Sequence, residues 1–141
     1  MKIFKKIDPH LGETEITVKT WSEEEYKKVF QVFDNRIKLE TKDGLRIVKR
    51  SELIYVEALR NYLDLHTEKE TLTVRLPLYK LKRLLGSDFI QVSRSYLINF
   101  QLLTSVEADV FNGMIARVSG LKVPVSQGYL KEIYKRMEEE L

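Results

Sequence analysis

Three short polar segments, each lying between apolar runs, carry the side chains of this sequence that could recognise a ligand. They are Leu59-Arg60-Asn61-Tyr62, Val92-Ser93-Arg94-Ser95 and Val125-Ser126-Gln127-Gly128. Arginine can bind guanine O6 and N7 through two hydrogen bonds, asparagine and glutamine can do the same for adenine, and serine hydroxyls can hold phosphate. The third segment also opens a helix, whose free amides favour an anion. These residue types predict binding to nucleic acid; the alternative is that they are ordinary turn and cap residues.

The middle segment is the clearest of the three. Residues 90–92 and residues 96–100 each alternate apolar and other side chains as a strand does, and Ser-Arg-Ser separates them. An arginine is almost never fully buried without a partner. We therefore expect two core strands that present Arg94 at a tight connection.

Charge is distributed unevenly along the chain. The formal net charge is +3, yet residues 1–35 sum to −1, whereas residues 71–136 carry ten basic and four acidic side chains. A cationic region around the second and third segments is expected if this part meets a polyanion. The alternative is a solvated surface with chance asymmetry. Candidate contacts to phosphate in this region are Lys80, Arg83, Lys122 and Lys131.

The residues needed for an enzyme or a metal site are missing. His66 shares a predicted strand face with Asp64, but no third ligand or nucleophile accompanies the pair, and His10 lies in an N-terminal loop. The serines and carboxylates have no triad-like or paired spacing. The chain has no cysteine, which excludes disulfides, thiolate zinc sites and a cysteine nucleophile. We expect no metal, no cofactor, no small-molecule substrate and no enzymatic activity.

The first 35 residues predict a strand followed by a helix. Residues 14–18 alternate as a short strand does, and Ser22 and Glu25 are spaced as a capping box. The helix that follows carries one apolar stripe and ends at Asp34-Asn35. Such a segment has too little to pack against alone, so it should dock on the main domain or on a second copy. The stripe consists of Tyr26, Val29, Phe30 and Phe33.

From Arg36 onward the pattern becomes that of an antiparallel β protein. Asp43-Gly44 predicts a two-residue hairpin turn that places Leu39 opposite Val48, and Asn112-Gly113 predicts a second hairpin turn. Residues 53–58 are apolar at nearly every position, as in a strand covered on both faces. Pro77 and Gly86 bracket a short helix, and Ser126 precedes the last one. Further strands are expected at residues 36–41, 45–50, 62–67, 71–76, 102–111, 114–118 and 121–125.

Four ordered pieces of the sequence resemble a known family. Residues 53–58, LIYVEA, followed by Asn61-Tyr62, resemble the strand I-x-Y-I-E-A of the LytTR domain. Residues 78–85 resemble its S-L-x-x-L-x-x-x-L helix, and residues 89–99, FIQVSRSYLIN, resemble F-I-R-V-H-R-S-Y-L-V-N. Residues 123–126, VPVS, resemble V-P-V-S-R. The sequence is thus similar to a LytTR domain, the DNA-binding module of many bacterial response regulators.

The resemblance runs from about Ile37 to Ile133 and implies a fold and a mode of binding. The fold would be mainly β, with elongated antiparallel sheets and short helices that lie along DNA and insert loops into successive major grooves. Two departures change the contacts, because Ser93 replaces the signature histidine and Gln127 replaces the usual arginine. The residues that the family's contact loops imply for DNA binding are Arg60, Asn61, Tyr62, Ser93, Arg94, Ser95, Ser126 and Gln127.

These observations lead to an expected organisation. Residues 1–35 form a strand-helix extension for dimerisation or partner binding, and residues 36–141 form the DNA-binding domain. A phosphoreceiver needs about 100 residues, so we expect none here; the chain resembles stand-alone LytTR proteins, which are often encoded beside a small membrane protein. With no apolar run of bilayer length and no signal peptide, a cytoplasmic location is expected.

We therefore expect a cytoplasmic, sequence-specific transcription regulator that acts as a homodimer on double-stranded DNA, with a small membrane protein as a candidate partner. The alternative is a protein-interaction module that regulates a membrane protein or another regulator.

Overall fold

The computed structural model describes residues 2–140, apart from the side chain of Val32. The chain divides into two compact units, Met1–Asp34 and Asn35–Leu141. Unit 1 contains helix α1 (Glu23–Phe33), and its start follows from the sequence: the Ser22 hydroxyl accepts a hydrogen bond from the Glu25 amide at 3.1 Å. The Glu25 carboxylate pairs with Lys28 rather than reaching back to the cap. The hydroxyl half of the predicted capping box is therefore present.

The predicted strand at residues 14–18 is wrong. These residues have no regular secondary structure, and the Ile16 side chain is exposed. Alternation allows a strand but does not supply the neighbouring strand that its backbone amides and carbonyls require. The first unit is thus an irregular segment followed by a helix.

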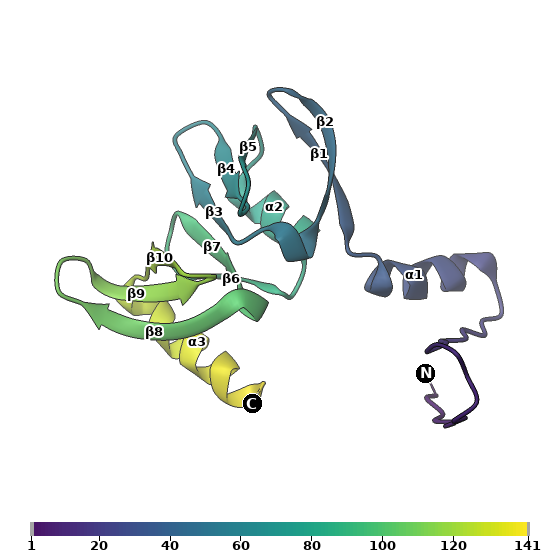
Figure 1. Ribbon diagram of the computed structural model, residues 1–141. Coiled ribbons are helices and arrows are strands. Elements are labelled where there is room, and N and C mark those ends of the chain that lie inside the picture. The colour runs from purple at the N-terminus through teal and green to yellow at the C-terminus, as the bar shows by residue number, and fades with distance from the viewer. Residues whose placement is uncertain (1, 141) are drawn as a thin grey trace. The chain divides into compact units, whose positions relative to one another are not determined.

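Unit 2 is built from two antiparallel sheets, shown in Figure 1. Sheet A has seven strands in the order β2-β1-β5-β4-β3-β7-β6, and sheet B has three in the order β10-β9-β8. The strands are β1 (Arg36–Thr41), β2 (Gly44–Lys49), β3 (Tyr55–Ala58), β4 (Leu63–His66), β5 (Thr71–Val74), β6 (Phe89–Gln91), β7 (Tyr96–Asn99), β8 (Leu103–Asp109), β9 (Gly113–Val118) and β10 (Leu121–Pro124). Helices α2 (Leu78–Leu85) and α3 (Gln127–Glu139) and the short 3-10 helices η1 (Arg50–Glu52) and η2 (Phe100–Leu102) complete it.

The β1–β2 hairpin has a different register from the predicted one. The two-residue loop is Lys42-Asp43, so Leu39 faces Arg46 and not Val48, and Val48 faces Ile37. Gly44 follows the loop with φ +119°, a conformation that L side chains rarely adopt. The partner of each residue moves by two positions, so every side chain keeps its predicted face.

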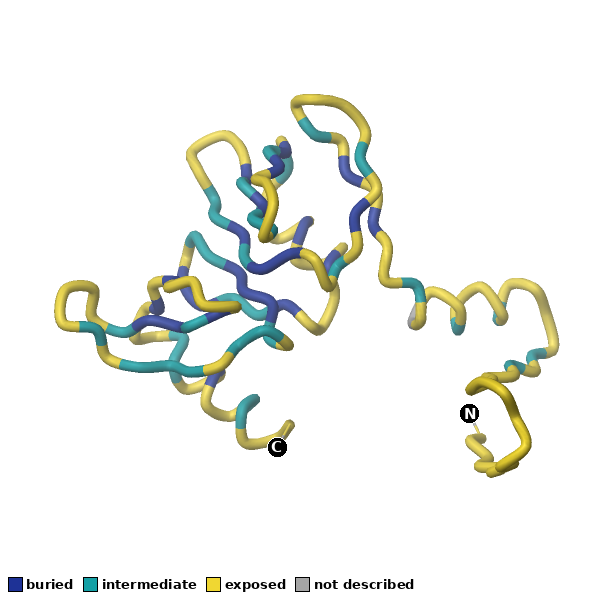
Figure 2. The backbone as a smooth tube through the Cα atoms, viewed as in Figure 1, coloured by how far each residue is buried: buried dark blue, intermediate teal, exposed yellow. Residues whose placement is uncertain are grey.

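Two apolar cores lie on opposite sides of the central strands. The first packs α2 against one face of sheet A, and the second lies among sheet A, sheet B and α3. Strand β3 and the residue that precedes it contribute to both, because Val56 belongs to the first core and Ile54 to the second. Figure 2 shows the buried tube concentrated in these central strands. The prediction that residues 53–58 are covered on both faces is confirmed.

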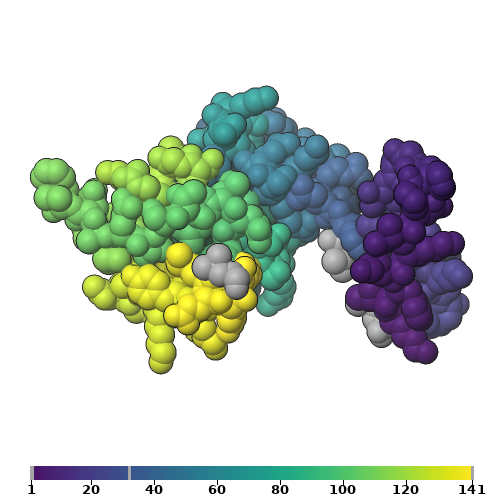
Figure 3. Space-filling view, turned by 60° about the horizontal axis from the view of Figure 1, so that its bottom comes forward, coloured from purple at the N-terminus to yellow at the C-terminus, as the bar shows by residue number. Residues whose placement is uncertain are grey.

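The helices end where the sequence indicates. Pro77 is the N-cap of α2 and Gly86 its C-cap, and Ser126 is the N-cap of α3, although its hydroxyl makes no cap hydrogen bond. In the space-filling view of Figure 3, α3 lies beside the strands of sheet B, and the end of the β8–β9 hairpin projects from them. Val110 and Phe111 at this hairpin end are each 92% exposed. Between residues 2 and 140, no helix has the length and apolar character that crossing a bilayer requires. The predicted fold class, mainly β with antiparallel sheets and short helices, is confirmed.

Candidate nucleic-acid interface

The three polar segments of the sequence meet in space. We call residues 59–62 the first loop, residues 92–95 the second and residues 125–128 the third. The Ala58 amide at the end of β3 donates to the Ser95 carbonyl at 2.7 Å, and the Ser126 amide donates to the Val92 carbonyl at 3.0 Å. The second loop is therefore held by backbone hydrogen bonds on both sides, between the strand that leads into the first loop and the third loop itself.

Within the second loop, one side chain is buried and its neighbour is presented to solvent. Ser93 is 7% exposed, and its hydroxyl accepts a hydrogen bond from the Ser95 amide at 3.2 Å. The Val92 amide donates to the Tyr96 carbonyl and closes the turn. Arg94 is exposed. Ser93 thus shapes the loop, and Arg94 is the side chain that the loop presents to solvent.

The other predicted DNA-binding residues are accessible. The first loop is closed by the Leu59 amide donating to the Tyr62 carbonyl at 2.8 Å, and the third by the Tyr129 amide donating to the Ser126 carbonyl at 3.0 Å. Ser95 is partly buried beside its Ser93 contact. All five predicted DNA-binding residues on these two loops are exposed: Arg60, Asn61, Tyr62, Ser126 and Gln127.

A tyrosine and a carboxylate tie the second loop to β3. Tyr96, the first residue of β7, lies opposite Glu57 in the β3–β7 pair, and its hydroxyl donates to the Glu57 carboxylate at 3.0 Å. Burial, followed by the hydrogen bond to Glu57 and the negative charge of that group, raises the pKa of Tyr96 to about 12. Tyr55 lies beside Tyr96, and its pKa is raised by burial and then by Glu57 and Asp64. These tyrosines stay neutral across physiological pH and anchor the loop.

Asn99 is a structural residue that the sequence analysis assigned no role. It is 2% exposed, its side-chain Nδ2 donates to the Leu53 carbonyl at 3.0 Å, and its side-chain Oδ1 accepts from the Gln101 backbone amide at 3.0 Å. It therefore joins the end of β7 to the entry of β3. The sequence did contain a signal for this role, because Asn99 is the last residue of the motif at residues 89–99. An asparagine beside buried apolar residues needs hydrogen-bond partners.

The four candidate phosphate contacts differ in their surroundings. Lys80, Arg83 and Lys131 are exposed, whereas Lys122 is held at 3.3 Å from Asp109 on the neighbouring hairpin. Desolvation alone would raise the pKa of Asp109, but the hydrogen bonds from Asn112 and Lys122 together with the charge of Lys122 lower it overall. Lys122 is therefore the least available of the four.

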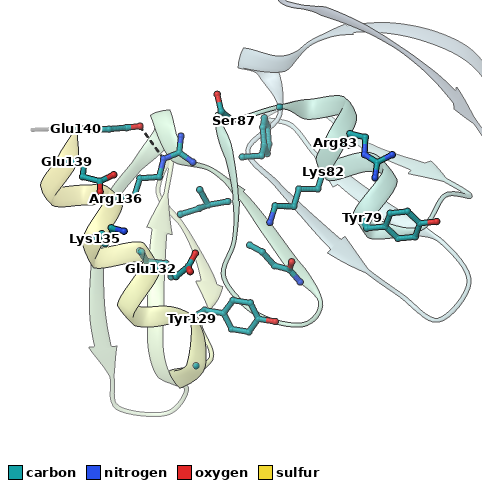
Figure 4. A pocket seen from close by; sticks show the side chains of 16 residues that line it. Tyr79, Lys82, Arg83, Ser87, Tyr129, Glu132, Lys135, Arg136, Glu139 and Glu140 are labelled. Carbon is teal, nitrogen blue, oxygen red and sulfur yellow. Dashed lines mark hydrogen bonds and ion pairs between the residues drawn. The ribbon is translucent and has the colours of Figure 1, made fainter.

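A groove runs between α2 and α3 beside the second and third loops. Its volume is about 950 Å³, and Gln91 and Gly128 lie on its wall. Figure 4 shows Lys82 and Tyr129 pointing into it, whereas Arg136 is engaged with Glu140 at 3.1 Å. Arg136 also lies 4.7 Å from the centre of the Phe100 ring. Basic and acidic residues both line the groove, so its charge is mixed.

His66 packs against an aromatic ring. It stacks on Tyr55 with 4.2 Å between ring centroids and contacts Thr71 through Nδ1 at 3.2 Å. Among residues 2–140, no group of three or more His, Asp or Glu side chains is placed to hold a metal ion. The sequence predicted that His66 and Asp64 share one face of a strand. In the structure, His66 on this face takes part in the packing of the sheet.

Sequence comparison decides the family. The model of the LytTr DNA-binding domain matches residues 43–138. The chain belongs to this family. The loops, anchors and groove described above are therefore those of a LytTR domain, a family of DNA-binding domains.

Two relatives of this LytTR protein carry the names of a sensory transduction protein and a transcriptional regulatory protein. The chain is 28% identical over 138 residues to the sensory transduction protein LytT of Bacillus subtilis (strain 168). This alignment covers 96% of the chain and 52% of LytT. It is 26% identical over 102 residues to the transcriptional regulatory protein LytR of Staphylococcus aureus (strain N315), covering 71% of this chain and 42% of LytR. The chain spans about half the length, or less, of these relatives.

A solved structure has the same fold. A LytTr DNA-binding domain from Bacillus cereus superposes with a TM-score of 0.61 at 29% sequence identity. The superposition covers 72% of this chain and 94% of that domain.

Proposed function

We propose that this LytTR protein is a sequence-specific transcription regulator that inserts its three loops into the major groove of double-stranded DNA. The observation that carries the proposal is the convergence of the loops through backbone hydrogen bonds, with Arg60, Asn61, Arg94 and Gln127 exposed on them. These are the side chains that read guanine and adenine edges. Such a protein acts where the DNA is, in the cytoplasm.

The loop residues divide into contacts and supports. Arg94 can bind a guanine edge through two hydrogen bonds, and Asn61 and Gln127 suit adenine. Tyr62, Ser95 and Ser126 suit phosphate or sugar contacts. Ser93 supports Arg94 through its bond to the Ser95 amide, so we propose that it positions the loop and does not touch a base.

The substitution Arg94→Ala tests the central assignment. We expect a loss of about 1–3 kcal/mol in binding to the protein's own operator, together with relaxed base preference at one position, since one good base contact contributes this much. Fragments selected from the host genome would supply the operator, and gel shifts would measure both quantities. If affinity and preference were both unchanged, the assignment of the second loop would be wrong.

Lys69→Ala is the matched control. Lys69 is an exposed cation in the β4–β5 turn, at the end of these strands opposite the first loop. Because it lies away from the three loops, operator affinity should change little.

A salt series separates this proposal from the alternative of a protein-interaction module. Binding that neutralises several phosphates weakens steeply as salt rises, because counterions released from DNA must be rebound. A module that recognises only another protein would give no operator complex at any salt concentration.

Two finer expectations stay predictions. They are a homodimer on paired sites and a small membrane protein as partner. The apolar stripe of α1 is a candidate partner surface, because Tyr26, Phe30 and Phe33 are 42%, 50% and 59% exposed. Capture from native membranes by the tagged protein should recover the membrane partner, and repeated failure would count against it.

A further inference from the structure

Strand β2 is a long and unprotected sheet edge. It ends the order of sheet A, and Leu45 and Ile47 on it are 60% and 65% exposed. On the same face, its neighbour β1 carries the charged residues Arg36, Lys38 and Glu40. Proteins usually place charges on edge strands to prevent pairing with other chains. Here the charged side chains lie mainly on the interior neighbour β1, whereas the edge strand β2 carries Lys49 and two large aliphatic side chains on this face.

The backbone of β2 is also arranged for pairing. Thr41 and Gly44 close the two-residue loop, and hydrogen-bonded pairs alternate along an antiparallel ladder. The amides and carbonyls of Leu45 and Ile47 therefore point away from β1, toward the free edge. The residues that expose apolar side chains are thus also those that offer free backbone groups.

We propose that β2 pairs antiparallel with β2 of a second copy about a two-fold axis at Arg46. In this register Leu45 of each copy faces Ile47 of the other, so four aliphatic side chains form one cluster on the exposed face. The same pairs exchange backbone hydrogen bonds. Lys38 lies beside Ile47 and Glu40 beside Leu45, so their aliphatic stems flank the cluster.

The charge at the axis is compatible with this register. Arg46 would face Arg46 of the second copy, and two like charges directly opposite each other are destabilising. Each Arg46, however, forms an ion pair with Glu70 in its own copy, in the turn between β4 and β5. The axis is therefore close to neutral. The register with Ile47 at the axis would place Leu45 against Lys49 and is less favourable.

This inference rests on the proposed function, because the β2–β2 interface would form the homodimer proposed there. The interface uses none of the three loops proposed to contact DNA. Dimerisation can therefore be measured without DNA. An Arg94→Ala protein that remains dimeric yet loses operator affinity would show that the two properties are separate.

Sedimentation equilibrium of the full chain tests the interface. We expect a reversible dimer whose dissociation constant rises about tenfold or more in Ile47→Lys, which places a cation among the aliphatic side chains. Phe111→Lys is the matched control, because Phe111 is equally apolar and 92% exposed at the end of the other sheet's hairpin. A monomeric wild-type protein at about 100 µM would overturn the proposal, as would an Ile47→Lys protein that dimerises like the wild type.

Cysteine cross-linking tests the register, because the chain contains no cysteine. In this register, residue 46 of one copy lies opposite residue 46 of the other. The two form a pair without backbone hydrogen bonds, in which the Cα atoms lie about 4.5 Å apart. Under a mild oxidant, Arg46→Cys should form a disulfide-linked dimer, whereas Ile47→Cys and Lys49→Cys should not. Efficient cross-linking at position 47 or 49 in place of 46 would overturn the register.

Discussion

Ser93 and Arg94 are neighbours in the chain, but only Arg94 presents its side chain to solvent. The buried Ser93 hydroxyl holds the Ser95 amide, and this bond orders the turn from which Arg94 projects. The replacement of the family histidine by serine thus falls at a position that supports the loop here. The replacement at Gln127 is different, because this side chain is exposed at the start of α3.

The substitution Gln127→Arg should strengthen operator binding and steepen its dependence on salt by about one unit of slope, since one more phosphate or guanine contact becomes available. Fluorescence anisotropy across a salt series measures both effects. Gln31→Arg, which adds the same charge to the exposed surface of α1, should leave the slope nearly unchanged. An equal effect from both substitutions would indicate that net charge alone is responsible.

Among the elements, β3 and β7 do most to fix the positions of the loops. They are paired; Tyr55 and Ile98 pack in the second core, and Val56 and Leu97 belong to the first. Because both faces of this pair are packed, a shift of either strand would disturb two cores at once. The first and second loops leave the same end of this pair, so its rigidity fixes their spacing.

The raised pKa of Tyr96, caused first by burial and then by the hydrogen bond to Glu57, predicts a loss of stability at high pH. The pKa of Tyr96 rises from its ordinary value of 10.0 to about 12 in the folded protein, so the folded state binds the proton more tightly than the unfolded state. This contribution is complete below pH 10 and is lost as pH rises through about 12. Urea unfolding at pH 9 to 12 should show a steeper loss for the wild type than for Tyr96→Phe. Parallel curves for the two proteins would contradict this linkage.

At the scale of the whole molecule, the two units differ in what stabilises them. The buried residues of both clusters run from Ile37 to Ile133, and none of the described side chains of unit 1 belongs to either cluster. Unit 1 instead exposes much of its apolar surface, including Trp21 at 85% and Phe4 at 86%. We propose that this exposed apolar area is a surface that meets a partner.

A protein that begins at Asn35 should therefore fold on its own. We expect cooperative thermal unfolding with a midpoint within a few degrees of the full chain, because the buried apolar contacts are retained. Circular dichroism and calorimetry would measure the midpoint. A non-cooperative transition would show that residues before Asn35 contribute to the core.

Much of the fold follows from local patterns in the sequence. Alternation located the strands of unit 2, Pro77 and Gly86 bracketed α2, and the three polar interruptions marked the loops. Such features depend on the steric preferences of a few consecutive residues and on which side chains avoid water. They are therefore encoded within short stretches of chain.

Other features required the packed molecule. Alternation could not distinguish the two registers of the β1–β2 hairpin, because a two-residue shift leaves every side chain on the same face. It could not show that residues 14–18 lack a partner strand, or that Ser93 is buried while Arg94 is exposed. Pairing and burial depend on segments distant in the chain, and the convergence of the three loops rests on two such contacts, from Ala58 to Ser95 and from Ser126 to Val92.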